Sequence, residues 1–168
     1  MEIDIKRSVC FTGHREIDPE MEHNVRALVR EAVKIYIKRG YDCFISGGAM
    51  GFDTIAAEEV IRLREEGNDI KLLLALPCKK QTVKWTCNDK VNRYANITEA
   101  ADGVVYTSDG YFNGCMHVRN RFMVDNSSVC IAYLTSSKGG TAYTCTYAEK
   151  KGKELVNLGA VATQLTIY

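Results

Sequence analysis

Short apolar runs rich in β-branched residues alternate with stretches of helical periodicity along this chain of 168 residues. The run 70–76 is apolar almost throughout, as in a strand covered on both sides of a sheet. This alternation predicts an α/β fold of three layers, in which a mainly parallel sheet carries helices on both faces. We expect strands at 8–12, 41–45, 70–76, 103–107, 129–134 and 154–158, helices at 20–39, 54–66, 116–125 and 142–151, and one or two less regular helices in 81–101.

No linker, repeat or low-complexity segment marks a second domain, so we predict a single domain over residues 1–168. That length is enough to bury a core without disulfides or a metal. Gly40 stands where the first helix should end in a left-handed residue. We expect Trp85 to pack on the sheet.

The composition, with 46% hydrophobic and 26% charged residues, is typical of a globular protein. A formal net charge of +1 creates no overall attraction to nucleic acid or membrane. The sequence has neither a run of about 18 apolar residues nor a basic-then-apolar start, so we expect no membrane span and no targeting segment. The odd number of cysteines, seven, and the place of Cys10, Cys43 and Cys130 in apolar runs indicate reduced thiols and a cytoplasmic location. Their spacing predicts no metal site.

The segment 46–53 is rich in glycine and connects a predicted strand to a predicted helix. Gly47, Gly48 and Gly51 permit a tight turn, and the helix start presents unpaired N–H groups with partial positive charge. Together with Ser46 this turn predicts a site for a phosphate-like anion, although its glycines could serve the turn alone. Asp53 is a candidate for contact with a sugar or for the helix cap.

The turn after the first strand, 12–15, offers further candidates. Gly13 lets the chain turn, and Arg15 has the geometry to hold a phosphate or carboxylate, or else to pair with a nearby acidic side chain. His14 is a weaker candidate for proton transfer, since its ordinary pKa lies near neutrality.

Two more polar segments flank the fifth predicted strand. Arg119, Asn120 and Arg121 precede it and could hold a phosphate and a sugar or base, but by composition alone a solvated face is the favoured interpretation. After the strand, Gly139, Gly140 and Thr141 open a helix and form a second anion site. Because the ends of parallel strands meet at one edge, we expect the turns after the first, second and fifth strands to converge.

Taken in order, these segments resemble DNA-processing protein A. Residues 46–53 with Ala56 and Ala57 resemble its S-G-x-A-x-G-[IF]-D-x-x-A signature, 119–122 its R-N-R segment, 140–153 its G-S…T…A…G-R helix, and 12–15 its glycine-arginine turn. The resemblance, over residues 10–153, is to the Rossmann-like SLOG superfamily and most of all to its small YpsA-like members. It implies a nucleotide-derived ligand at the glycine turns and a homo-oligomer, for which Tyr143 and Tyr147 are candidate contacts.

We therefore expect a binding domain for a nucleotide or nucleotide derivative of the ADP-ribose or NAD type, acting as sensor or regulator. Arg15 and Arg119 would neutralise phosphate, the glycine turns and Thr141 would donate backbone N–H groups, and Asn120 or Asp53 would contact sugar or base.

Two alternatives stay open. A nucleotide N-glycosidic hydrolase, as in the related Lonely Guy phosphoribohydrolases, needs a carboxylate beside an arginine, for which Asp53, Asp125 and Glu149 are candidates. The glutamate that those enzymes carry just beyond their Gly-Thr pair is missing here. Single-stranded DNA binding is not favoured, because residues 78–101 lack a dense basic patch with interleaved aromatics.

Overall fold

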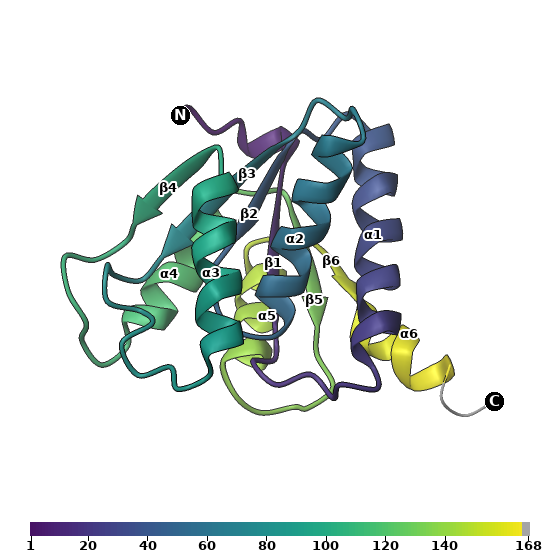
Figure 1. The fold of residues 1–168 in the computed structure, drawn as a ribbon. Coiled ribbons are helices and arrows are strands. Elements are labelled where there is room, and N and C mark those ends of the chain that lie inside the picture. Colours follow the sequence, from purple (N-terminus) through teal and green to yellow (C-terminus); the bar gives the residue numbers. More distant parts are fainter. Residues whose placement is uncertain (166–168) are drawn as a thin grey trace.

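The computed structural model describes the backbone of residues 1–165 and the side chains of residues 1–161. Within these residues six parallel strands form one sheet, in the order β4-β3-β2-β1-β5-β6 (Figure 1). The strands are β1 (Ser8–Gly13), β2 (Cys43–Ser46), β3 (Lys71–Leu76), β4 (Gly103–Tyr106), β5 (Val129–Tyr133) and β6 (Glu154–Asn157). The helices are α1 (Glu22–Lys38), α2 (Phe52–Glu65), α3 (Asn88–Ala100), α4 (Cys115–Asp125), α5 (Gly140–Lys150) and α6 (Leu158–Leu165), preceded by the 3₁₀ helix η1 (Ile5–Arg7).

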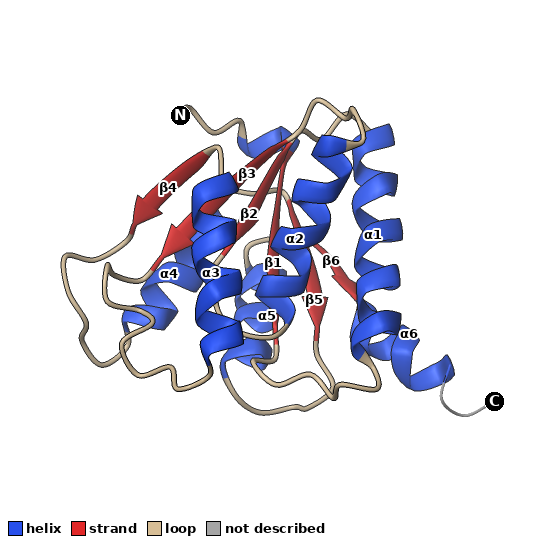
Figure 2. Cartoon of the chain, viewed as in Figure 1, coloured by secondary structure: helices blue, strands red, loops and turns tan. Residues whose placement is uncertain are grey.

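Helices cover both faces of the sheet, which confirms the predicted layered, Rossmann-like α/β fold. In Figure 2, α1, α2 and α3 lie across one face, while α4 and α5 lie behind the sheet. Successive residues of β3 serve the two faces in turn: Leu72 and Leu74 join the core on the α1 and α2 side, and Leu73 joins the core on the α4 side. The run 70–76 is apolar because both faces of this strand are buried.

The strand order places a switch point between β1 and β5. From β1 the chain builds the sheet in one direction through β2, β3 and β4, and it then returns to lay β5 against the other side of β1. Thr12 and Gly13 at the end of β1 are in register with Ala132 and Tyr133 of β5. Connections diverge from such a pair of strands, so the space beyond their carboxyl ends is open to a ligand.

The observed elements differ from the predicted ones mainly at their ends. Gly40 has φ +91° after α1, as predicted. The segment 81–101 holds α3, preceded by turns, and Trp85 packs edge-on against Tyr94 of α3 with 5.4 Å between ring centroids. Helix α6 is not among the predicted elements, because its eight residues include a glycine and give only a weak helical signal. Within residues 1–165 no helix has the length and apolarity needed to cross a bilayer.

Candidate functional site

A cavity of about 310 Å³ opens at the carboxyl edge of the sheet, between the turn after β1 and the start of α5. We call it the central cavity. Its walls come from four segments that are far apart in the sequence: Thr12, Gly13, His14, Arg15, Ala49, Asp53, Met116, His117, Arg119, Asn120, Gly140 and Thr141. Of the other residues predicted for the site, Ser46 ends β2, and Gly47, Gly48, Gly51 and Gly139 lie in the adjoining turns. The structure thus brings the predicted turns together.

The glycine turn after β2 is held by its own hydrogen bonds. Ser46 is fully buried, and its hydroxyl donates to the Asp53 carbonyl at 3.1 Å and accepts the Gly48 N–H at 3.3 Å. Gly51 has φ +76°, and a Cβ there would lie 2.5 Å from the carbonyl oxygen of His14. Ser46 therefore braces the turn from inside, and Gly51 permits this turn to pack directly on the turn after β1.

Gly47 separates the two buried charges of the site. A Cβ at this position would lie 2.5 Å from Nη1 of Arg119 and 2.8 Å from Oδ2 of Asp53. The carbonyl oxygen of Gly47 accepts a hydrogen bond from the Arg119 guanidinium. A side chain at residue 47 would clash with both groups, so the glycine is required by its neighbours.

Asp53 is a wall of the cavity and does not cap α2, because Gly51 occupies the N-cap position. The side chain is 4% exposed, and Oδ2 accepts the Ala49 N–H at 3.3 Å. Oδ1 has no hydrogen-bond partner among the residues that the structure describes. Burial raises the pKa of Asp53 to about 6, and the neighbouring Arg119 charge opposes this rise. Asp53, which lines the cavity, thus holds a buried acceptor without a partner.

Arg119 and Arg121 point in different directions from α4. Arg119 is 4% exposed, and its Nε donates to Oδ1 of Asn120 at 2.7 Å. Burial lowers the pKa of Arg119, while the carboxylate of Asp53 partly offsets that effect. Arg121 instead donates to the Tyr143 hydroxyl at 3.0 Å, outside the cavity. The interpretation of this segment as a solvated face is wrong for Arg119 and Asn120, which are both buried.

The turn after β1 supplies a fixed histidine and an exposed arginine. His14 accepts the Thr135 N–H through Nε2 at 3.0 Å and so joins the turns after β1 and β5. With Nε2 acting as acceptor, the neutral ring has its proton on Nδ1, and His14 serves to position these turns. Arg15 is exposed and also lines the two cavities that adjoin the central one.

The start of α5 faces the central cavity with uncapped backbone. Gly139 is the N-cap residue with φ +97°, and it has no capping side chain. Gly140 and Thr141 follow and line the cavity, so N–H groups of the first helical turn and the partial positive charge of the helix end lie beside it. A Cβ at Gly140 would have no atom of the described residues within 4 Å. This backbone is therefore open to an anion.

A second cavity, of about 500 Å³, adjoins the first and is mainly apolar. We call it the apolar cavity. It shares Arg15, Ala49 and Met116 with the central cavity. Its other walls were not assigned to the site from the sequence: Met50, Lys80, Gln81, Val83, Lys84, Trp85 and Tyr111. The sequence signal for this cavity is the presence of Trp85, Tyr111 and Phe112 in two irregular segments, where aromatic residues have no helix or strand face to bury them.

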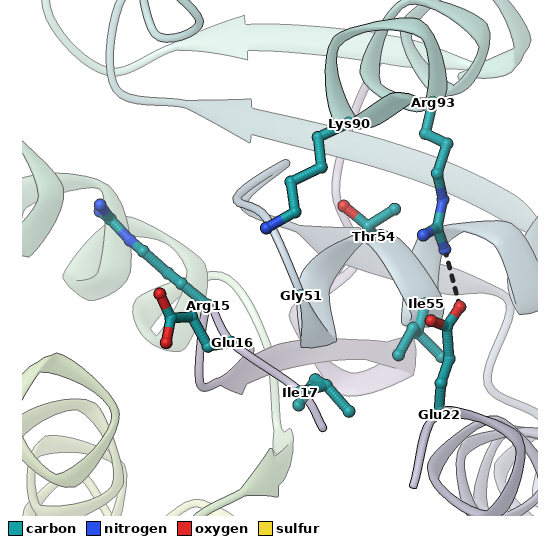
Figure 3. A pocket seen from close by; sticks show the side chains of 9 residues that line it. All are labelled: Arg15, Glu16, Ile17, Glu22, Gly51, Thr54, Ile55, Lys90 and Arg93. Atoms are coloured by element: carbon teal, nitrogen blue, oxygen red, sulfur yellow. Dashed lines mark hydrogen bonds and ion pairs between the residues drawn. The ribbon is translucent and has the colours of Figure 1, made fainter. Parts of the chain in front are cut away.

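A third cavity, of about 280 Å³, lies at the start of α2 (Figure 3). The amino group of Lys90 reaches from α3 toward the turn at Gly51, while the guanidinium of Arg15 points away from Lys90 (Figure 3). Arg93 is held by Glu22 at 3.2 Å and by Glu58 at 2.7 Å. We call this the α2 cavity; Arg15 connects it to the central cavity.

The three carboxylates proposed for hydrolysis lie in different parts of the structure. Asp53 lies in the central cavity with Arg119. Asp125 is on the outer side of α4, where it accepts from the Tyr147 hydroxyl at 2.9 Å. Glu149 is exposed on α5. Tyr143 and Tyr147, the candidate oligomer contacts, both have hydroxyl partners within the chain.

Comparison with known proteins identifies a protein family and individual relatives to which this chain is similar. The family model YpsA, described as the YspA SLOG family, matches residues 9–162. The SPbeta prophage-derived protein YoqJ of Bacillus subtilis is 31% identical over 119 residues, which cover 64% of this chain and 69% of YoqJ.

Solved structures show the same fold. DNA processing protein A from Helicobacter pylori superposes with a TM-score of 0.62 and 25% identity; the match covers 88% of this chain and 63% of that one. The molybdenum cofactor carrier protein of Chlamydomonas reinhardtii superposes with a TM-score of 0.58 and 18% identity, over 95% and 82% of the two chains. The chain therefore spans less than two thirds of the Helicobacter pylori protein.

Proposed function

This chain belongs to the YspA SLOG family, and on that premise we propose that it binds a nucleotide or nucleotide derivative in its central cavity and acts as a sensor or regulator. The ligand class follows from two opposite kinds of group that line the same cavity. Donors for an anion are Arg15 and the first turn of α5, with the Arg119 charge beside them. An acceptor is the unpaired Oδ1 of Asp53.

The observation that carries the proposal is this pairing of anion donors with a buried carboxylate. A simple inorganic anion would gain nothing from Asp53, whose negative charge repels it. A ligand with both a phosphate and sugar hydroxyls fits each group, because phosphate binds at a helix start beside arginine and a hydroxyl donates to the carboxylate. A leftover buried acceptor costs about 1 to 3 kcal/mol, which a ligand hydroxyl would recover.

The relatives support the nucleotide unit as the ligand. DNA processing protein A from Helicobacter pylori binds single-stranded DNA, and a nucleotide is the unit that such a strand shares with a free nucleotide. The present chain has a formal net charge of +1, which provides no broad positive field along which a strand would lie. A small ligand enclosed by the cavities is therefore the favoured form.

The test is a binding titration by calorimetry with AMP, ADP-ribose and NAD. We expect saturable binding of at least one of them by the wild-type protein. Arg15→Ala should weaken that binding about tenfold or more, since a charge-assisted contact to phosphate contributes about 1.5 to 3 kcal/mol.

Arg121→Ala is the matched control, because Arg121 lies outside the cavity on Tyr143. It should bind like the wild type. Absence of binding by all three compounds at millimolar concentration, or equal affinity of the Arg15 and Arg121 variants, would refute the proposal.

One observation favours hydrolysis of the N-glycosidic bond as a second candidate. Asp53, with a pKa raised to about 6 by burial, stands beside the Arg119 charge in the cavity where the sugar is proposed to lie. A carboxylate in that place can stabilise positive charge on the sugar or take a proton from water. Chromatography of the mixture after incubation of the protein with AMP distinguishes the two functions. Release of adenine by the wild type that is lost in Asp53→Asn identifies an enzyme. Recovery of intact AMP identifies a binding protein.

A further inference from the structure

We propose that the apolar cavity is a subsite for a flat heteroaromatic ring that carries an exocyclic amino group, with adenine as the simplest example. This inference rests on the proposed function, because the ring would belong to the nucleotide whose sugar and phosphate lie in the central cavity. Three features of the structure support it: the aromatic and apolar walls, an unpaired amide oxygen, and the direct connection of the two cavities.

The walls fit a flat apolar ring. Trp85 is half-buried, lies edge-to-face with Tyr94 at 5.4 Å between ring centroids, and lines the cavity. Val83 and Tyr111 at the rim are 71% and 67% exposed, although both are large apolar side chains. The Nζ of Lys84 lies 5.4 Å from the centre of the Tyr111 ring and brings a positive charge to the mouth. Exposed apolar groups around a hollow indicate a surface that a ligand covers.

Gln81 provides the polar contact within these walls. The residue is 9% exposed and lines the cavity, yet its Oε1 has no hydrogen-bond partner among the described residues. Its Nε2 donates to the Gly47 carbonyl oxygen at 3.4 Å. That contact fixes the orientation of the amide, because the reverse orientation would set two oxygens against each other. Gln81 therefore holds a buried, unpaired acceptor beside the cavity, and an amino group is the ligand part that would satisfy it.

The two cavities join where Arg15, Ala49 and Met116 line both. The carbonyl oxygen of Gly47 lies between them, since it accepts from Arg119 on one side and from Gln81 on the other. A ligand that extends from Asp53 toward Gln81 thus passes from a polar compartment into an apolar one. This order, from phosphate to sugar to ring, is the order of groups in a nucleotide.

Two matched pairs of compounds test the subsite. AMP and IMP, and likewise CMP and UMP, differ by the exchange of an amino group for a carbonyl oxygen. We expect the wild-type protein to bind AMP about tenfold more tightly than IMP and CMP more tightly than UMP, because a carbonyl oxygen would face Oε1 of Gln81. Gln81→Met keeps the volume of the side chain and removes the acceptor, so it should abolish the preference.

The apolar wall is tested separately from the sugar and phosphate site. Trp85→Ala should weaken AMP binding about tenfold, since stacking of a base on an aromatic ring contributes at this scale. It should leave the binding of ribose 5-phosphate, which has no base, unchanged. Tyr106→Ala is the control, because Tyr106 is an exposed aromatic residue on β4.

Each failure has its own signature. If neither AMP nor ribose 5-phosphate binds, the proposed function itself is wrong. If both bind and Trp85→Ala has no effect on AMP, or if AMP and IMP bind alike, the ring subsite is refuted. Tighter binding of a short oligo(dA) than of AMP, with an affinity that falls steeply with salt, would replace the free nucleotide by a single strand as the ligand.

Discussion

Asp53 is the residue on which the chemistry of the site depends. Its carboxyl group is buried, holds the glycine turn through Ala49, and leaves one buried oxygen unpaired beside the cavity. A group placed only for stability would not combine burial, a nearby arginine and an unused acceptor. Buried groups whose charged form is destabilised in this way are typical of binding and catalytic positions.

The raised pKa of Asp53 gives a testable dependence of stability on pH. The folded protein binds this proton more tightly than the unfolded chain, with a pKa of about 6 against the ordinary 3.8. Its destabilising effect is therefore absent below about pH 4 and complete above about pH 6, and amounts to about 1 to 3 kcal/mol. The difference in unfolding free energy between the wild type and Asp53→Asn should shift against the wild type by that amount as the pH rises from 4 to 7.

Urea unfolding at several pH values measures this difference. The attraction between the ionised Asp53 and the Arg119 charge belongs to the same titration, because it lowers the pKa of Asp53 and is already contained in the value of about 6. Asp125→Asn, on the surface of α4 and outside the cavities, is the control substitution. If the difference in unfolding free energy between the wild type and Asp53→Asn is constant between pH 4 and pH 7, the pKa of the Asp53 carboxyl is not raised.

At the scale of elements, α2 connects the site to the rest of the fold. Its first turn carries Asp53, and its middle carries Glu59, whose side chain is 2% exposed. Arg26 of α1 and Arg62 of α2 each donate a hydrogen bond to Glu59 at 2.9 Å, and Arg93 of α3 donates one to Glu58. These contacts tie α2 to both neighbouring helices and fix its start at the cavity.

Removal of Glu59 should therefore cost far more than removal of a surface partner. Glu59→Ala leaves Arg26 without its buried acceptor, and we expect a loss of about 2 to 4 kcal/mol in the free energy of unfolding. The control Glu31→Ala removes an exposed pair with Lys34 on α1 and should cost less than about 0.5 kcal/mol. Urea denaturation measures both, and equal losses would mean that the buried cluster adds no stability.

For the whole molecule, the strand order decides where a ligand can act. The switch between β1 and β5 opens the carboxyl edge, while the opposite edge is closed by tight turns such as those at Gly40 and Gly67. Arg15 lies where the central, apolar and α2 cavities meet. Ligand binding should therefore affect the residues along this edge of the sheet. That the chain acts as a homo-oligomer, as its resemblance implies, stays a prediction.

Hydrogen exchange measures the extent of this edge. With saturating AMP we expect slower exchange of backbone amides in 13–15, 47–51 and 139–142, which surround the cavities. Amides in 39–42 and 66–70, at the opposite edge, should be unchanged, because they open locally without breaking ligand contacts. Uniform slowing at both edges, or protection confined to the opposite edge, would contradict the proposed location.

The sequence predicted the fold well because the signals for it are local. Apolar runs and helical spacing identify strands and helices, and alternation of the two requires parallel strands joined by crossovers. The convergence of the turns followed from the same topology. Gly13, Arg15 and Gly140 needed only their place after a strand to be assigned to this edge, and the central cavity includes all three.

What the tertiary structure decided is which side chain faces inward. Arg119 and Arg121 are equivalent in composition, but two residues along a helix turn the side chain by about 200°, so one is buried at Gly47 and the other meets Tyr143. Gln81, Trp85 and Tyr111 form one cavity although they lie in irregular segments, which have no periodicity to predict their direction. The sequence thus determined the sheet and the edge that holds the site, because these depend on local pattern. The composition of the cavities depends on packing between distant segments, and only the folded structure specifies it.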